Sequence, residues 1–271
     1  MTGRGRTLRL RQRLSQRDLA ILLSLRQLRL LTGQQLQRLH FADGHRPTQA
    51  RKTRAALKRL SELGVIVRLA RRMGGLHAGS DGYVIGLSGL GFAVLDASHS
   101  GSGRRHRRVN DTKPAFQDHV LAVSDLYVQL TEDDRAGHSE LLEFAAEPEA
   151  WRHFSGSGGQ RVTLKPDAYV RLGVGDYELA AFIEQDMDTE STPTIARKLG
   201  VYINYWRSGL EQRARDVFPL VWWLVPDTNR LSELSRTIRR VPEDARQLFK
   251  VALTSHAATQ LTQLPDKGGA L

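Results

Sequence analysis

Three carboxylates in the second half of the chain have a spacing that places them on one face of a sheet. Asp167 follows a proline where a strand is expected to begin, and Glu184 and Asp186 are two residues apart on the next expected strand. If these strands form a hairpin, Asp167 and Glu184 lie close together, and like charges that close favour protonation unless a cation lies between them. Hard divalent cations prefer oxygen ligands. We therefore expect Mg²⁺ or Mn²⁺ bound by Asp167, Glu184 and Asp186.

A divalent ion at such a site would suit the hydrolysis of a phosphodiester. It would lower the pKa of a bound water and neutralise the charge that builds up on a phosphate. The elements that carry these residues follow the order helix, three strands, helix, strand, which predicts an α/β sandwich around a mixed sheet. The expected helices span residues 115–130, 194–206 and 232–240, and the expected strands span 140–146, 162–172, 177–187, 218–225 and 248–253.

A proline-aspartate pair followed by a hairpin and a Glu-x-x element, within this order, resembles the PD-(D/E)xK nuclease fold of restriction-type endonucleases. The chain is more similar still to the actinobacterial replication-relaxation family. That resemblance implies a plasmid or integrative-element protein with a winged helix and a nuclease-like domain, related to tyrosine-free conjugative relaxases that nick DNA at a transfer origin. The segments that carry it are LTGQQLQRLHF (31–41), GLSGLGFAVL (86–95), KPDAYV (165–170), FIEQDMDTES (182–191) and KLGVY (198–202).

The resemblance implies roles for individual residues. Asp167 matches the aspartate of the PD motif and Glu184 matches the acid of the Glu-x-Lys element, so both are expected catalytic residues and metal ligands. Asp186 stands where the motif has its lysine, and an aspartate cannot stabilise a phosphate as a lysine does. Lys198, on the following helix, is the expected catalytic substitute. Lys165, two residues before Asp167, is a second candidate.

Simpler interpretations apply to several neighbours of these residues. Asp188 and Glu190 follow the acidic strand and are expected to be solvated, although Glu190 also falls within the pattern of the family. The aromatic residues of this half are expected to pack in the core and not to act as nucleophiles; they include Tyr202, Tyr205, Trp222 and Trp223.

The net charge of +11 is unevenly divided along the chain. Residues 1–113 hold 23 lysines and arginines against six acids, whereas residues 114–271 hold 17 against 23. This division indicates that the first half binds a polyanion, and it favours a protein partner for the acidic half. A Gly/Ser-rich and then basic stretch separates the two. We expect a winged helix-turn-helix domain at 1–97, a basic flexible linker at 98–114 and a PD-(D/E)xK nuclease-like domain at 115–271.

The first half has the pattern of three helices followed by a hairpin. Ser15 begins a capping box that predicts a helix start. A third helix is expected from about Thr48, with Gly64 where the helix end favours positive φ. Alternating residues then predict strands at 65–70 and 83–87 on either side of a Gly-rich, basic tip. Three helices and such a hairpin are the order of a winged helix-turn-helix.

Positive charge is concentrated on the expected third helix and hairpin. From Arg46 to Arg72 there are nine basic residues and one acid, Glu62, whereas a solvated helix face usually mixes both signs. The third helix would enter the major groove, with Thr48, Gln49 and Arg51 as base-reading candidates, and the hairpin would meet phosphates or the minor groove. The expected partner is double-stranded DNA at a plasmid origin or a promoter, and the expected DNA-binding residues are Thr48, Gln49, Arg51, Lys52, Arg54, Lys58, Arg68, Arg71 and Arg72.

Missing sequence features exclude other chemistries. The chain has no cysteine, so it has neither disulfides nor a thiolate metal site. None of its nine histidines forms the His-hydrophobe-His site of common relaxases, and no GxxxxGK[ST] loop is present. The apolar runs are too short to span a bilayer and no signal peptide is evident, so we expect a cytoplasmic protein.

Three functions are compatible with this sequence. The first is a metal-dependent DNA endonuclease, nickase-like or relaxase-like, that is recruited by its winged helix. The second is a non-catalytic DNA-binding factor of plasmid replication or transfer, in which the nuclease-like domain serves for docking. The third is a transcriptional regulator with an unrelated sensor domain.

Overall fold

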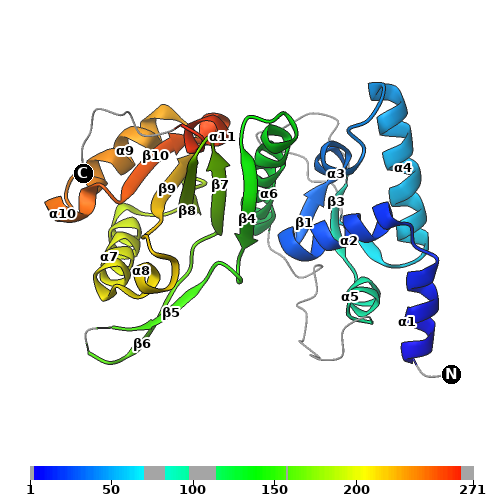
Figure 1. The fold of residues 1–271 in the computed structure, drawn as a ribbon, viewed down its shortest axis with the longest axis horizontal. Coiled ribbons are helices and arrows are strands. Elements are labelled where there is room, and N and C mark those ends of the chain that lie inside the picture. The colour runs from blue at the N-terminus through cyan, green and yellow to red at the C-terminus, as the bar shows by residue number, and fades with distance from the viewer. Residues whose placement is uncertain (1–2, 70–82, 98–113, 157, 264–271) are drawn as a thin grey trace. The chain divides into compact units, whose positions relative to one another are not determined.

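The computed structural model describes residues 3–69, 83–97, 114–156 and 158–263, and within these ranges the chain forms two compact units. The first unit comprises Met1–Val128 and the second Gln129–Leu271. Both units combine helices with a β-sheet (Figure 1). Within the described ranges, no helix is long and apolar enough to cross a membrane.

The first unit has a small antiparallel sheet with helices around it. The strand order is β1-β3-β2, and β1 is a short strand that the sequence pattern did not predict. The elements are α1 (Gly3–Gln12), α2 (Gln16–Leu28), β1 (Leu30–Thr32), α3 (Gly33–His40), α4 (Arg46–Glu62), β2 (Ile66–Leu69), β3 (Val84–Leu87), α5 (Gly89–Asp96) and the first part of α6 (Pro114–Arg135).

Local hydrogen bonds explain where these helices begin and end. The predicted capping box is present, since the Ser15 hydroxyl accepts from the Asp18 amide and the Asp18 carboxylate accepts from the Ser15 amide. Helix α4 begins two residues before the predicted start, with Pro47 in its first turn, where a missing amide proton costs nothing. It ends at Glu62, and Gly64, directly after the C-cap Leu63, has a φ of +72°, which suits glycine as predicted.

The first part of α6 packs on the first unit. The Ser124 hydroxyl donates to the Leu30 carbonyl at 2.8 Å, and the Gln35 amide donates to the Leu121 carbonyl at 3.0 Å. Arg38 also pairs with Asp125 at 3.0 Å. The division between the units falls inside α6. Of the predicted linker at 98–114, all but the last residue lie outside the described residues.

The second unit is built on a five-stranded mixed sheet of order β10-β9-β8-β7-β4. Strands β4, β7 and β8 are antiparallel, whereas β8, β9 and β10 are parallel. Helices α7 and α9 lie side by side over one face (Figure 1). After α6 the elements are β4 (Glu140–Ala146), β5 (Arg152–Ser155), β6 (Arg161–Leu164), β7 (Ala168–Val174), β8 (Tyr177–Gln185), α7 (Thr192–Ser208), α8 (Leu210–Arg215), β9 (Leu220–Val225), α9 (Thr228–Ile238), α10 (Glu243–Arg246), β10 (Phe249–Leu253), the 3₁₀ helix η2 (Thr254–His256) and α11 (Ala257–Leu261).

The segment that was predicted as one strand at 162–172 is two strands. Strand β6 ends at Leu164 and pairs with β5 in a separate hairpin, and β7 begins at Ala168 in the main sheet. Pro166 lies at the break, because a proline cannot donate to a strand ladder. The prediction of a single strand was therefore wrong, but Asp167 still lies directly before a strand of the main sheet.

Aromatic side chains pack α7 against the sheet. The Phe182 ring centroid lies 5.4 Å from that of Tyr169 and 5.9 Å from that of Tyr202. These three side chains and Trp223 are at most 1% exposed, which confirms the core prediction for Tyr202 and Trp223. Trp222 alternates to the other face and is only half-buried. The tight packing fixes the face of α7 that lies over β8.

Gly91 provides a test of the packing in the first unit. An added Cβ would overlap the Val65 carbonyl oxygen and the Leu87 side chain, whereas a Cβ at Gly89, in the same helix, has no atom within 4 Å. We expect Gly91→Ala to lower the free energy of unfolding by about 1–3 kcal/mol, as overpacking does. Gly89→Ala is the matched control and should be neutral or slightly stabilising. Equal denaturant unfolding curves for the two variants would contradict this close approach.

Candidate functional site

The β7–β8 hairpin places Asp167 beside Glu184. Ala168 lies opposite Ile183 in the antiparallel register, so Asp167 and Glu184 are the next pair and their side chains share a face. The Asp167 amide donates to the Ile183 carbonyl at 2.9 Å, and the Gln185 amide donates to the Asp167 carboxylate at 2.7 Å. The structure thus brings together the two carboxylates that the sequence spacing paired.

Glu184 is buried between two donors from α7. The residue is 2% exposed, and each of its two carboxylate oxygens accepts a hydrogen bond from a different side chain. Lys198 Nζ donates to Oε2 at 2.9 Å, and the Tyr202 hydroxyl donates to Oε1 at 2.6 Å. Lys198 and Tyr202 are four residues apart, which is one helical turn, so both reach the same carboxylate. Lys198, the expected substitute for the motif lysine, thus contacts the predicted acid Glu184 directly.

Burial and a neighbouring charge favour the neutral form of Glu184. Burial and, second, the charge of Asp167 raise the pKa of this carboxyl, while Lys198 and Tyr202 lower it, and the net result is a pKa of about 7. Burial also disfavours the charged form of Lys198, but the charge of Glu184 and the hydrogen bond to Glu190 outweigh it and raise the Lys198 pKa. The amine is consequently an ammonium at neutral pH.

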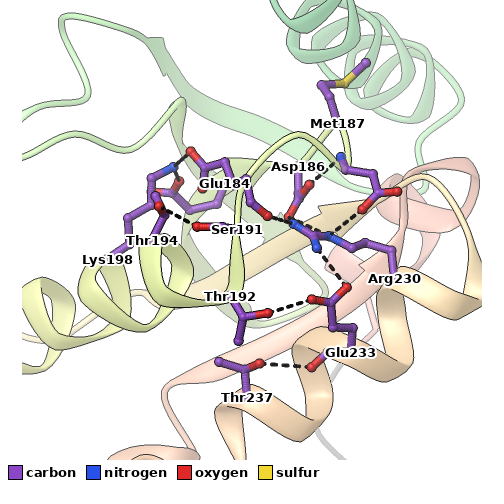
Figure 2. Close-up of polar contacts among 12 residues, drawn as sticks. Glu184, Asp186, Met187, Ser191, Thr192, Thr194, Lys198, Arg230, Glu233 and Thr237 are labelled. Carbon is purple, nitrogen blue, oxygen red and sulfur yellow. Dashed lines mark hydrogen bonds and ion pairs between the residues drawn. The ribbon is translucent and has the colours of Figure 1, made fainter.

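Asp186 lies on the same sheet face but is paired with a different cation. Its side chain is fully buried, and one of its oxygens accepts from Arg230 Nε at 3.1 Å and from Arg230 Nη2 at 2.8 Å. Arg230 lies in the first turn of α9 and is itself buried. Figure 2 shows Asp186 turned toward Arg230, while Glu184 faces Lys198. The third expected metal ligand is thus held in an ion pair of its own.

Glu190 joins the cluster and Lys165 does not. Glu190 Oε1 lies 2.8 Å from Lys198 Nζ, and its side chain is 31% exposed, so the prediction of simple solvation was wrong for this residue. Lys165 is exposed and its ammonium lies 4.7 Å from the centre of the Trp151 ring. Asp188, by contrast, is exposed at 56% of its side chain, although it also contacts Arg230.

The cluster of Asp167, Glu184, Glu190, Lys198 and Tyr202 is called the acidic cluster below. Among the residues that the structure describes, no group of three or more His, Cys, Asp or Glu side chains has the geometry to hold a metal ion. Of the three expected metal ligands, Asp167 and Glu184 are the two carboxylates that lie next to each other. Both oxygens of Glu184 already accept hydrogen bonds, from Lys198 and Tyr202.

A second candidate surface lies on α4 of the first unit. Thr53, Leu57 and Leu60 are buried along one stripe, as predicted, and the other face is exposed and basic. Arg59 and Lys58 of this face do pair with acids: Arg59 Nη2 lies 2.6 Å from Asp18 and Lys58 Nζ lies 3.9 Å from Glu62. Within the described ranges no acidic side chain pairs with Arg51, Lys52 or Arg54. The exposed cations predicted to bind DNA are Arg51, Lys52, Arg54 and Lys58.

The remaining predicted DNA-binding residues differ in whether their side chains are exposed or already bonded within the protein. The Gln49 amide donates to the Ala42 and Gly44 carbonyls at 2.7 and 2.8 Å, so it stabilises the turn before α4. Thr48 is half-buried near the start of α4. Arg68 is exposed on β2, with its guanidinium 5.7 Å from the centre of the Tyr83 ring. Arg71 and Arg72 lie outside the described residues.

The raised pKa of Glu184 predicts how stability changes with pH. Because the folded-state pKa of about 7 lies above the ordinary 4.5, the protonated carboxyl stabilises the fold at low pH, and this contribution is lost as pH rises through 7. From about pH 5 to about pH 8 the wild type should lose about 2.5 kcal/mol relative to Glu184→Gln, which has no proton to release. Urea unfolding over this range measures the difference. Parallel profiles for the two proteins would exclude a perturbed Glu184.

Comparison with known proteins assigns the chain to a family. The sequence profile of the family described as Replication-relaxation matches residues 22–221, which include α4 and the acidic cluster. No curated protein and no solved structure matches the chain. A match over most of the chain agrees with the resemblance found in the sequence segments. The chain therefore belongs to the replication-relaxation family.

Proposed function

We propose that this protein binds double-stranded plasmid DNA during replication or transfer. The family suggests a role in plasmid replication or transfer, and one observation in the first unit supports DNA as the partner. The exposed face of α4 carries Arg51, Lys52 and Arg54, and no acidic side chain in the described ranges neutralises them. Unpaired cations on one helix face form a surface that attracts phosphates.

The order of elements in the first unit supports a winged helix-turn-helix. Helices α2, α3 and α4 are followed by the antiparallel strands β2 and β3. In such a domain α4 is the recognition helix, whose N-terminal residues contact base edges while its cations contact phosphates. Since the amide of Gln49 is used within the protein, Thr48 and Arg51 are the better base-reading candidates, and Arg68 is a phosphate contact from the wing.

Charge reversal on α4 tests this proposal. We expect the triple variant Arg51→Glu, Lys52→Glu, Arg54→Glu to remove most of the affinity for duplex DNA and to reduce the slope of log K against log salt by about 3. The matched control reverses three exposed arginines in the last turn of α9 and directly after it, Arg236, Arg239 and Arg240, and changes the total charge by the same amount. Fluorescence anisotropy over a salt series measures both. Equal losses would mean that net charge, and not α4, governs binding.

A second candidate activity is metal-dependent nicking of DNA by the acidic cluster. It is favoured by the convergence of two carboxylates and an amine, Asp167, Glu184 and Lys198, on elements whose order resembles the one expected for PD-(D/E)xK nucleases, apart from the added β5–β6 hairpin. The pair Asp167 and Glu184 suits a hard divalent ion, because two carboxylates on adjacent strands disfavour each other's charge and supply only oxygen donors.

Asp167, Glu184 and Lys198 of the acidic cluster would each have their own role in cleavage. Asp167 and Glu184 would hold Mg²⁺ or Mn²⁺, which lowers the pKa of a bound water and neutralises charge on a phosphate. Lys198 stays protonated beside both carboxylates and offers its ammonium to a phosphate oxygen. Asp186 takes no part, because Arg230 holds it. The amine thus comes from α7 and not from the strand position that the motif uses.

Conservative substitutions test the nicking activity. With Mg²⁺ or Mn²⁺, the wild type should nick supercoiled plasmid from its own element, and Asp167→Asn, Glu184→Gln and Lys198→Met should each reduce the rate by about 100-fold or more. Glu178→Gln is the control, because Glu178 lies on the same strand but pairs with Arg171. All variants should keep their affinity for DNA.

If the wild type binds DNA and yet nicks no substrate with any metal or origin sequence, that result would favour a non-catalytic role for the second unit. In that case the unit is a docking domain, and its acidic surface would bind a protein partner. A regulator with a sensor domain would instead show specific binding to promoter DNA and no dependence on the acidic cluster.

A further inference from the structure

We infer that Arg230 is a positioning residue for Lys198, acting through residues 186–191, the loop that joins β8 to α7. This role lies outside the acidic cluster itself, and its catalytic meaning rests on the proposed nicking function. Arg230 also lies beyond the part of the chain that the family profile matches. Neither the expected motif nor the family match therefore assigned it a role.

The guanidinium of Arg230 binds the loop at both of its ends. Its Nη2 donates to the Asp186 carboxylate at 2.8 Å, where the loop begins, and to the Glu190 carbonyl at 2.7 Å, near where it ends. Its Nε lies 3.2 Å from the Asp188 carboxylate in between. The side chain is 4% exposed, so these contacts are made away from water. One planar group thus holds the loop closed.

The loop conformation depends on such a closure. Asp188 has a φ of +57°, which is uncommon for a residue with a side chain, and its amide donates to the Asp186 carboxylate at 2.5 Å. A left-handed turn of this kind persists only where surrounding contacts hold it. Because Asp186, Asp188 and Glu190 all contact the same guanidinium, loss of Arg230 removes all three restraints together.

The loop delivers Glu190 to the acidic cluster. Glu190 Oε1 lies 2.8 Å from Lys198 Nζ, which in turn donates to Glu184 at 2.9 Å. The contacts therefore run without a break from Arg230 through the Glu190 backbone to the Lys198 ammonium. Arg230 also pairs with Glu233 at 2.9 Å, and Glu233 accepts from the Thr192 hydroxyl at the start of α7 (Figure 2). The helix that carries Lys198 is thus tied to Arg230 at its first turn.

Stability alone is a weak reason for an arginine at this place. A buried ion pair loses the hydration of both charges, and apolar residues of similar volume often serve stability as well or better. A guanidinium offers what they lack, namely several donors in a fixed plane that can bind a carboxylate and a carbonyl at once. The contacts of Arg230 use this property, because they join two segments whose relative position determines where Glu190 lies.

The reactivity of Lys198 toward an acetylating reagent tests the inference without DNA or metal. In the full chain at neutral pH, mass spectrometry measures the acetylation rate of Lys198 relative to Lys58, whose side chain is 74% exposed. We expect Arg230→Met to increase the relative rate by about 10-fold, as loss of one charge-assisted hydrogen bond to Lys198 would. Glu190→Gln should give a similar increase. The double variant should be no faster than the faster single variant, because both act through one contact.

Two control variants separate positioning from general loosening. Arg207→Met removes an exposed ion pair with Asp244 and should leave the Lys198 rate unchanged. A Lys198 rate within twofold of the wild type in Arg230→Met, or additive effects with Glu190→Gln, would show that Arg230 is only a structural ion pair. If circular dichroism shows that Arg230→Met is unfolded, Arg230→Lys keeps the charge but cannot bridge Asp186 and Glu190. An unchanged rate in that variant overturns the inference.

The nicking assay distinguishes this inference from the proposed function. If the wild type nicks DNA, Arg230→Met should lower kcat while the Kd for DNA stays constant, since α4 is untouched; an unchanged kcat would contradict positioning. If no variant nicks DNA but Lys198 reactivity responds to Arg230 and Glu190 as expected, the coupling stands and the cleavage proposal falls.

Discussion

The second unit is organised by the need to compensate carboxylates that are buried at one end of its sheet. A buried carboxylate is costly unless hydrogen bonds or an opposite charge accompany it. Glu184 meets this need with Lys198 and Tyr202 from α7, and Asp186 meets it with Arg230 from α9. The two helices that cover this face of the sheet therefore each bring one cation to one acid. Their packing and the electrostatics of the strand end depend on each other.

The same compensation governs the chemistry that the acidic cluster can perform. A cation that neutralises Glu184 also occupies it, so a metal ion and Lys198 compete for the same oxygen. The two acids of the Glu-x-Asp element are accordingly not equivalent. Glu184 lies beside Asp167 and an amine that is 35% exposed, whereas the side chain of Asp186 is fully buried in its ion pair. At this strand end, Glu184 is thus accessible to a ligand through Lys198, whereas Asp186 has a structural role.

The sequence predicted those features that depend on short-range periodicity. The alternation of strand residues is enough to pair Asp167 with Glu184. Lys198 was expected near these acids from the resemblance to the nuclease motif, and not from periodicity. Periodicity was not enough to find Arg230, because the pattern shows that Glu184 and Asp186 share a face but not which helix covers each of them. The break at Pro166 was missed because β6 pairs with β5, a contact outside the main sheet. The place of α6 depends on partners such as Leu30, far away in the sequence.

The β7–β8 hairpin also has a consequence for the order of folding. Its strands are joined by a tight turn at Gly175, so this contact is local and is expected to form early. Lys198 reaches the hairpin only when α7 docks, and β9 joins β8 in parallel only after α7 and α8 have been traversed. Asp167 and Glu184 therefore meet before their cation arrives. Docking of α7 then both buries apolar surface and relieves this repulsion. Completion of the sheet and docking of its helix layer are therefore expected to occur together.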